Sequence, residues 1–421
     1  MNFRSGFFIA LRYLWARAHE GGRYLRGAAA GIALSLVPIM VTMIVADGMI
    51  RGITDRYLEL GTGHLQIFDF LDLGGLDDSP VRTANVAGVR GVWQERQGLG
   101  VLAGPGGRAG ATIRAVDASF WDDEGSGKFL RVIEGEAKPP SSRTILLGEG
   151  LAGAIGAKVG DNVPVMTIRS LDDGSTFPRL TPFTVAGIIS SGYRELDALW
   201  CIMDYEAGQR ILSPEFSDDH LIVKIDDPYR NSDAVAEKIS DTLGLGYGVY
   251  TWKELQRSQY SSYESTRQLL LFIMALIVLV AAVNVSSATS MLAIERQRDI
   301  AVLKAAGASP VETSRIFLWG ALLTSLCGAI LGIGTGLLIG IFINQIIGGL
   351  ESIINFFSRF FHGGPVKLLD PGFYLQEIPI IINWQMVFFI GLFTVLSSLV
   401  SSWIPARRAG KIPPMEILRK Y

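Results

Sequence analysis

Cysteine and histidine are scarce in this sequence of 421 residues, which holds two of the first and four of the second. Cys201 falls in a polar, glycine-rich region and Cys327 in a long apolar stretch, so no disulfide between them is expected. The histidines stand at His19, His64, His220 and His362. No pair of them has the spacing of metal ligands, and the sequence therefore predicts no metal and no cofactor bound by this chain.

Motifs for nucleotide chemistry and for hydrolysis are also lacking. Residues 125–129 (GSGKF) resemble the end of a phosphate-binding loop, but Asp122 stands where that loop needs glycine and Phe129 where it needs Ser or Thr. No Gly-x-Ser-x-Gly nucleophile elbow is present. A formal net charge of −2 gives no global field for nucleic acid. The sequence predicts a chain that is not an enzyme and has no nucleic-acid partner.

Long uncharged apolar stretches are what the sequence has in abundance, since 49% of its residues are hydrophobic. A helix needs about 20 such residues to cross a bilayer core of ~30 Å. Four stretches meet this requirement, at residues 27–46, 268–294, 316–350 and 378–406. The third is long enough to continue beyond a span. The prediction is an α-helical membrane protein with four transmembrane helices.

Arginine and lysine gather in the N-terminal tail, between the second and third stretches, and in the C-terminal tail. Short basic segments stay in the cytoplasm, so both termini are expected there. The 26 residues before the first stretch are longer than the n-region of a signal peptide, which predicts an uncleaved helix. We expect an interfacial helix in residues 1–26, transmembrane helix 1 in 27–50, a periplasmic domain in 51–266 and helices 2–4 in 267–421. A solvated N-terminal helix is the alternative.

The segment predicted to be translocated has short β-type runs separated by Gly, Pro and Asp, with helical patterns between them. The strand-like runs are residues 111–116, 143–147, 162–168, 183–189, 200–203, 221–225 and 247–252. Residues 232–243 have the spacing of a helix. This alternation predicts a large α+β domain of two subdomains.

Small residues recur every four positions in the third apolar stretch, at Gly328, Gly332, Gly336 and Gly340. They form one ridge on a helix, which lets another helix approach closely inside lipid. The ridge predicts helix packing, either within one subunit or between two.

The basic segment between the second and third stretches, residues 295–308, reads as a short amphipathic helix. Ile300, Leu303 and Ala306 share one face, and Gly307 is placed to end the helix. Ser309 then caps the next helix, with Glu312 completing a capping box. A rigid helix at the cytoplasmic surface can receive a push from a soluble motor, although as a shape alone it is only a well-capped turn.

Residues 295–310 resemble the coupling segment of the ABC permease superfamily that includes MacB-type macrolide exporters, FtsX-like cell-division permeases and lipoprotein-releasing (Lol) permeases. Four spans with a large domain between the first and second is also the layout of that superfamily. Motifs similar to those across the superfamily are residues 147–152 (LGEGLA), 159–161 (VGD), 183–187 (FTVAG), 405–409 (PARRA) and 414–419 (PMEILR). Residues 8–14 (FIALRYL) and the segment 373–379 resemble the LolC/LolE branch in particular.

This resemblance implies a multi-pass permease of the bacterial inner membrane, paired with a second permease that is the same or a related chain. It implies that a cytoplasmic ABC ATPase dimer, which binds ATP and Mg, drives the pair. In the lipoprotein-releasing branch the pair extracts lipoproteins from the membrane lipids and passes them to a periplasmic lipoprotein carrier. An FtsX-like permease that activates a periplasmic hydrolase, or MacB-like export of an amphiphile, are the alternatives.

Three sets of candidate residues accompany the resemblance. Coupling to the ATPase is expected at Glu295, Arg298, Asp299, Ile300, Leu303, Lys304 and Gly307. A substrate path is expected at the extracytoplasmic end of the first two spans, because an acyl-anchored client must enter from the outer leaflet, and flexible methionine suits variable acyl chains. Its residues are Met40, Met43, Ile44, Met49, Phe272, Ile273 and Leu276. Plain helix packing is the alternative for each of these residues. A hook for the carrier is expected in residues 171–182, at Phe177, Pro178, Arg179 and Leu180, with an ordinary long hairpin loop as the alternative.

Overall fold

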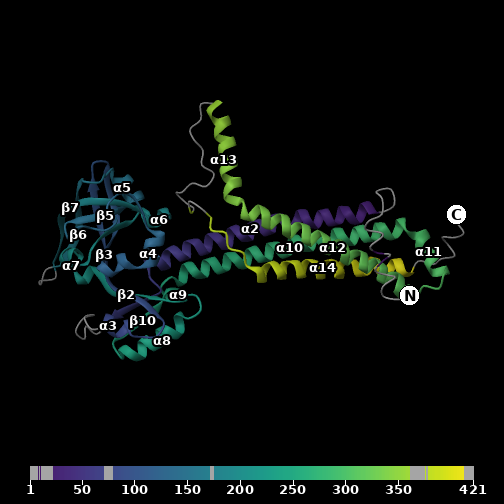
Figure 1. Cartoon of the computed structure of the whole chain (residues 1–421), viewed down its shortest axis with the longest axis horizontal. Helices are drawn as coiled ribbons and strands as arrows, with labels where there is room; N and C mark the ends of the chain where they lie inside the picture. Colours follow the sequence, from purple (N-terminus) through teal and green to yellow (C-terminus); the bar gives the residue numbers. More distant parts are fainter. Residues whose placement is uncertain are drawn as a thin grey trace. The chain divides into compact units, whose positions relative to one another are not determined.

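The computed structural model describes residues 8, 10, 22–70, 79–170, 175–360, 375 and 378–411 (Figure 1). The chain divides into two compact units. We call them the helical unit, which comprises Met1–Gly48, Tyr263–His362 and Pro379–Tyr421, and the sheet unit, which comprises Met49–Ser262 and Gly363–Ile378. The interfacial helix expected in residues 1–26 lies mostly outside the described residues, although Phe8 and Ala10 are helical.

Helices make up the described part of the helical unit. They are α2 (Gly22–Arg56), α10 (Arg257–Glu295), α11 (Gln297–Ala305), α12 (Pro310–Ile341), α13 (Ile343–Phe360) and α14 (Trp384–Lys411). Among the described residues, four of these helices, α2, α10, α12 and α14, are long and apolar enough to cross a bilayer.

Two of the four expected spans reach beyond the helices observed, whereas the other two lie within longer helices. The third apolar stretch breaks at Phe342, and its last part belongs to α13, which leaves the axis of α12 (Figure 1). In α13 the apolar residues recur at helical spacing with polar residues such as Gln345 and Ser352 between them, a pattern typical of an interfacial helix and not of a span. The fourth helix begins only at Trp384, so residues 378–383 precede it.

The core of the helical unit is built by α2, α10 and α12. Ile32, Leu36 and Ile39 of α2 are buried against Met274 and Val278 of α10 and small residues of α12. At one end of the unit a second cluster joins Leu25 of α2 to the ends of α10, α12 and α14 and to α11. The helices therefore form a bundle in which α2 contacts several partners.

The described strands belong to the sheet unit, which also holds short helices. The strands are β1 (Leu65–Asp69), β2 (Val89–Gly104), β3 (Gly107–Val116), β4 (Arg131–Gly135), β5 (Thr144–Gly148), β6 (Asn162–Ser170), β7 (Thr176–Ser190), β8 (Trp200–Asp204), β9 (Ser217–Ile225) and β10 (Tyr247–Thr251). The helices are α3 (Ser79–Ala84), α4 (Glu124–Phe129), α5 (Glu149–Ile155), α6 (Arg194–Asp197), α7 (Tyr205–Ile211), α8 (Ser232–Leu243) and α9 (Trp252–Leu255). A π-helical turn, η1 (Tyr57–Gly61), continues α2, and two 3-10 turns are η2 (Ala118–Asp122) and η3 (Pro214–Phe216).

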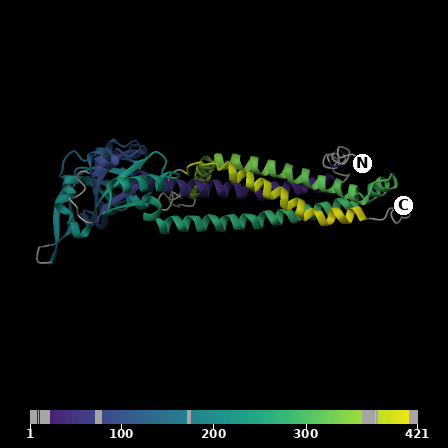
Figure 2. The same cartoon turned by 90° about the horizontal axis from the view of Figure 1, so that it is seen from below.

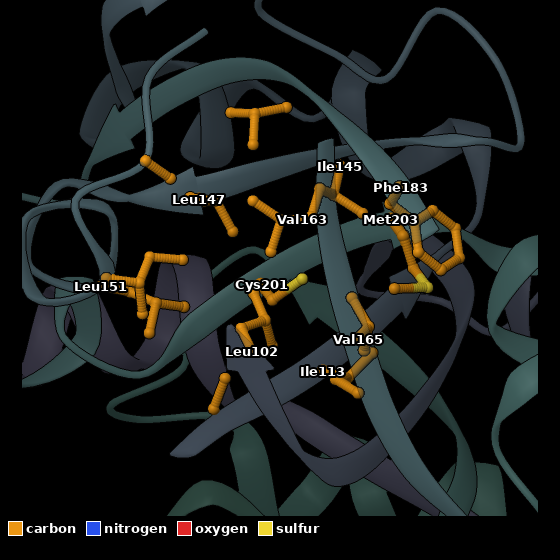
Figure 3. Close-up of a cluster of buried hydrophobic side chains, with 14 of the residues drawn as sticks. Leu102, Ile113, Ile145, Leu147, Leu151, Val163, Val165, Phe183, Cys201 and Met203 are labelled. Atoms are coloured by element: carbon orange, nitrogen blue, oxygen red, sulfur yellow. The ribbon is translucent and has the colours of Figure 1, made fainter. Parts of the chain in front are cut away.

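The strands form one sheet in the order β10-β1-β9-β2-β3-β8-β5-β7-β4, and β6 pairs with both β2 and β7. This second pairing closes β2, β3, β8, β5, β7 and β6 into a ring. Apolar side chains fill the ring, among them Leu102, Ile113, Val165 and Cys201 (Figure 3). Another core lies where α8 covers β1 and β9, apart from the ring, and the long strand β2 takes part in both regions.

The seven runs predicted as strands all lie in strands, and α8 spans the predicted residues 232–243. Two end residues are exceptions, because Arg143 precedes β5 and Trp252 begins α9. The sequence patterns missed β1, β2 and β4.

Candidate functional site

Helix α11 occupies the segment expected to couple to an ATPase, and one of its faces is buried in the bundle. Ile300 and Ala301 are buried, and Ile300 packs with Leu25, Phe317 and Ala406. The predicted face was only partly right, because Leu303 is half-buried and Ala306 is exposed. Contacts from the other helices of this cluster decide the buried face, and a short helical pattern cannot specify them.

The exposed face of α11 carries Arg298, Val302 and Ala305 at helical spacing. Val302 is 56% exposed and apolar, and it was missed by the sequence analysis. Asp299 makes an ion pair with Arg296 at 3.1 Å inside the segment, while Glu295 is the last residue of α10. A partner would therefore meet Val302 and Arg298, whereas Asp299 already has a neighbour.

The end of α11 is rigid for local reasons. Gly307 has φ of +94°, a conformation that side-chain-bearing residues avoid, and its N–H donates to the carbonyl of Lys304. The predicted capping box is confirmed: Ser309 N–H donates to Glu312 at 2.8 Å, and Glu312 N–H donates to the Ser309 hydroxyl at 3.2 Å. These contacts fix the direction in which α12 leaves α11.

The glycine ridge of α12 faces α2 of the same chain. A Cβ at Gly328 would lie 2.7 Å from the carbonyl oxygen of Ala29, and one at Gly332 would lie 2.8 Å from Cα of Ala33. At Gly336 and Gly340 the nearest atoms belong to Met40 and Ile44. In the single chain the ridge therefore gives packing within one subunit.

The structure does not bring the residues expected along the substrate path onto one surface. Met40 is 1% exposed, and Met43 and Ile44 are also buried among α12 and α14, while Met49 is half-buried. Phe272, Ile273 and Leu276 are exposed on α10, with Phe272 63% exposed. Apolar residues predominate along these helices, so hydropathy alone could not distinguish a lipid-facing position from a packed one.

A cavity of about 520 Å³ lies elsewhere in the helical unit, between α10 and α14 and against Ile39 of α2. Apolar side chains such as Met274, Phe389 and Phe393 line most of it. Arg267, Asn383 and Gln385 are its polar residues, and the Arg267 guanidinium lies 3.5 Å from the Asp47 carboxylate. No sequence pattern indicated this site, because its residues come from segments about 120 positions apart.

The hairpin of β6 and β7 contains the residues expected to form the hook (Figure 2). Phe177, Pro178, Arg179 and Leu180 lie within β7 and pair with β6, so the expected loop 171–182 is largely strand; residues 171–174 lie outside the described residues. The strands predicted here are shorter than those observed, because prolines interrupt the β-type pattern of the sequence.

The two faces of this hairpin differ. Cross-strand partners share a face, and Ile168 opposes Pro178 while Met166 opposes Leu180. That face is apolar and open, with Leu180 64% exposed. Phe177 and Arg179 lie on the other face, where Arg179 donates to the Arg210 carbonyl at 3.0 Å. We call Met166, Ile168, Pro178 and Leu180 the outer hairpin face.

Buried charges hold the end of the helix formed by α2 and η1. Lys224 donates to the carbonyls of Leu58 and Glu59 at 2.7 and 2.9 Å, and Arg114 donates to the carbonyl of Leu60. Cations stabilise the carbonyl end of a helix, which carries partial negative charge. The Arg114 guanidinium also makes a two-bond pair with Glu95, at 2.6 and 2.8 Å.

Glu59 balances the charge of Lys224 at this helix end. Its carboxylate accepts from Lys224 at 2.7 Å and contacts His64 Nε2 at 3.1 Å. Burial raises the pKa of Glu59, but the His64 hydrogen bond and the charge of Lys224 outweigh it and lower that pKa to about 2. Burial lowers the pKa of His64 and of Lys224. These ionised pairs are structural, and among the described residues no group of three or more His, Cys, Asp or Glu could hold a metal ion.

Two family models match the chain. The MacB-like periplasmic core domain matches residues 27–242, more than half of the chain, and the FtsX-like permease C-terminal domain matches residues 271–414. The first model covers most of α2 and most of the sheet unit. The second covers the larger part of α10 and continues through α11, α12, α13 and α14.

Similar proteins match nearly from end to end. The lipoprotein-releasing system transmembrane protein LolC of Neisseria meningitidis serogroup B is 27% identical over 98% of both chains. LolC of Haemophilus influenzae is 24% identical over 100% of both. Among solved structures, the periplasmic region of MacB from Actinobacillus actinomycetemcomitans is 14% identical with a TM-score of 0.32, and the match covers 48% of this chain and 95% of that one.

Proposed function

Because the chain belongs to the family of ABC transporter permeases that join a MacB-like periplasmic core domain to an FtsX-like permease domain, we propose that it releases lipoproteins from the inner membrane. In this proposal it is a permease subunit that extracts lipoproteins and hands them to a periplasmic carrier. The observation that carries the proposal is the similarity to LolC over 98% of both chains, which includes the sheet unit as well as the helices.

The topology we propose has four transmembrane helices, α2, α10, α12 and α14, with both termini cytoplasmic. The start of α2 and the end of α14 share one end of the helical unit with α11, and these two helix ends carry Arg23, Arg26, Arg407 and Arg408. The sheet unit is then periplasmic, and α13 follows α12 at the outer surface, where its apolar stripe of Ile346, Leu350 and Ile353 suits the interface.

Extraction needs an external source of energy. Each buried CH₂ of a lipid anchor contributes about 0.8 kcal/mol to membrane binding, so a multiply acylated protein does not leave the bilayer on its own. We propose that a cytoplasmic ATPase dimer, which binds ATP and Mg, supplies this energy through the exposed face of α11. A second permease, the same or a related chain, completes the pair.

The outer hairpin face is the surface we propose for the carrier. Its neighbouring side chains are apolar and open, and such exposed patches mark binding sites. Pro178 and Pro182 lie in the part of β7 that has β6 as its neighbour, and proline there discourages pairing with another strand. The hairpin is therefore suited to docking through its side chains and not through strand addition.

Depletion of the chain in its own bacterium tests the function directly. Mature lipoproteins should accumulate in the inner membrane, while an outer-membrane protein without a lipid anchor is sorted as before. Normal lipoprotein sorting after depletion, together with a defect in cell-wall cleavage or in export of an amphiphile, would overturn the proposal in favour of the FtsX-like or MacB-like alternative.

A further inference from the structure

The cavity between α10 and α14 is elongated along the helices. On α10 its lining runs from Arg267 to Val278, and on the other side it runs from Asn383, just before α14, to Phe393 within α14. Eleven helical steps of 1.5 Å span about 16 Å, and half of a bilayer core of ~30 Å is about 15 Å. In the proposed topology the cavity thus runs from the outer surface of the membrane to the level of its midplane.

Polarity changes along this axis. The polar residues Arg267, Asn383 and Gln385 lie at the outer end, and the lining below them is aliphatic and aromatic, ending at Val278 and Phe393. A volume of about 520 Å³ is within the range of sites for small molecules. The cavity therefore offers an apolar slot under a polar mouth. A lipid of the outer leaflet has the same order of polarity, with a polar headgroup above apolar acyl chains.

The mouth presents donor groups to an anion, beside the carboxylate of Asp47. Arg267 is 43% exposed on its side chain, and its Nε makes no hydrogen bond, the contact with Asp47 being an ion pair at 3.5 Å. A guanidinium binds phosphate through well-oriented donors, and the amide groups of Asn383 and Gln385 add further donors beside it. The diacylglyceryl anchor of a lipoprotein carries no phosphate, so the charge at the mouth distinguishes the two kinds of lipid.

We propose that this cavity binds one glycerophospholipid of the outer leaflet, with an acyl chain between α10 and α14 and its phosphate on Arg267. The lipid fills the space between the two helices and competes with Asp47 for the guanidinium. It is a resident of the permease and is not cargo. The inference rests on the membrane placement of the helices and holds whatever the permease transports.

Photolabelling tests the proposal on the full chain in nanodiscs of phosphatidylethanolamine. The probe is phosphatidylglycerol with a diazirine midway along one acyl chain. In the unaltered chain the label should fall on peptides of α10 and α14. Ala275 lines the cavity, so Ala275→Trp should fill it and abolish that label. Val283→Trp, on an exposed position of the same helix, is the matched control and should leave the label unchanged.

Arg267→Gln probes the mouth without filling the slot. It should raise the apparent Kd for phosphatidylglycerol about tenfold, because a charge-assisted contact to phosphate is lost. A second probe, a diacylglyceryl lipopeptide with the same diazirine, separates the two lipid sources. Labelling of the cavity by the lipopeptide and not by phosphatidylglycerol overturns the proposal, as does phosphatidylglycerol labelling that is equal in Ala275→Trp and Val283→Trp. Labelling by phosphatidylglycerol with lipoprotein sorting unaffected by depletion would keep this site and reject only the proposed function.

Discussion

His220 in β9 is a buried histidine whose two ring nitrogens make no hydrogen bond among the described residues. Its ring packs on Phe68 with centroids 5.2 Å apart. Burial lowers the pKa of His220, and the charges of Glu95, Arg114 and Asp219 around it act in opposing directions. Folding thus keeps His220 neutral at a pH at which the same histidine in the unfolded chain would take up a proton.

Acid should therefore weaken the sheet unit from about pH 6.5 downward. Below that pH the unfolded histidine binds a proton that the folded one refuses, so the free energy of unfolding falls as pH falls, by up to about 1.4 kcal/mol per pH unit for each such histidine. His220→Leu should keep stability at pH 8 and reduce this slope, with the contribution of His64 remaining. Thermal unfolding of the detergent-solubilised chain between pH 8 and 5 measures it, and an unchanged slope in the variant contradicts the assignment.

Two glycines of α12 that lie two residues apart should respond in opposite ways to substitution by alanine. A Cβ at Gly332 would lie 2.8 Å from backbone atoms of Ala33, whereas one at Gly334 would meet nothing within 4 Å. Gly332→Ala should destabilise the bundle by about 1–3 kcal/mol, since the helices must separate. Gly334→Ala should be neutral or stabilise by about 0.5–1 kcal/mol through helix propensity. Melting temperatures of the two purified variants decide, and equal values would mean that α2 and α12 are not in close contact.

Helix α11 should transmit force through its exposed face. Val302→Asp places a charge where a partner surface is proposed, and an unpaired charge at an interface costs several kcal/mol. Lipoprotein release should fall at least about tenfold while the chain still inserts, because Val302 is not part of the core. Val81→Asp, at a similarly exposed valine in the sheet unit, is the control. Normal release in Val302→Asp, measured by spheroplast release assays, would remove this face from the coupling site.

The hairpin should bind the carrier through one face only. The double variant Ile168→Ser and Leu180→Ser removes apolar side chains from the outer hairpin face and should weaken carrier binding about ten- to a hundredfold. Phe177→Ser, on the other face, should have a smaller effect. Pull-down of the carrier reports the difference. Undiminished yield with the double variant would reduce the hairpin to a structural element.

Sequence patterns predicted those elements whose signal is local. The capping box at Ser309, the helix α8 and the strands β3, β5, β6, β7 and β8 of the sheet-unit ring depend on residues close together in the chain, whereas β2 of the same ring was missed. Which face an apolar helix buries depends on distant contacts, and so the placement of Met40 beside Gly336 was not foreseen. The cavity at Arg267 and the pair of Arg114 with Glu95 were missed for the same reason, because nothing local distinguishes them.

The proposed function assigns ATP hydrolysis to a partner subunit, so the purified chain should not hydrolyse ATP. The sequence has no complete phosphate-binding loop, and the residues that resemble one form the short helix α4, where the Asp123 carboxylate accepts from Ser126 N–H at 2.9 Å. A phosphate-release assay on the chain alone should give no signal above buffer, and added ATPase subunits should restore activity. Activity that co-purifies with the chain through size exclusion would contradict this.

The cations that hold the last carbonyls of the helix made by α2 and η1 also bear on how this helix opens. Helix ends ordinarily exchange their amide hydrogens with solvent first, since their last turns are the least protected. Here Lys224 and Arg114 tie the final turn into the interior of the sheet unit, and Thr62 N–H closes it on the carbonyl of Tyr57. Deuterium should therefore enter residues 57–61 late, together with the core strands, so that the helix terminus behaves in exchange as part of the sheet.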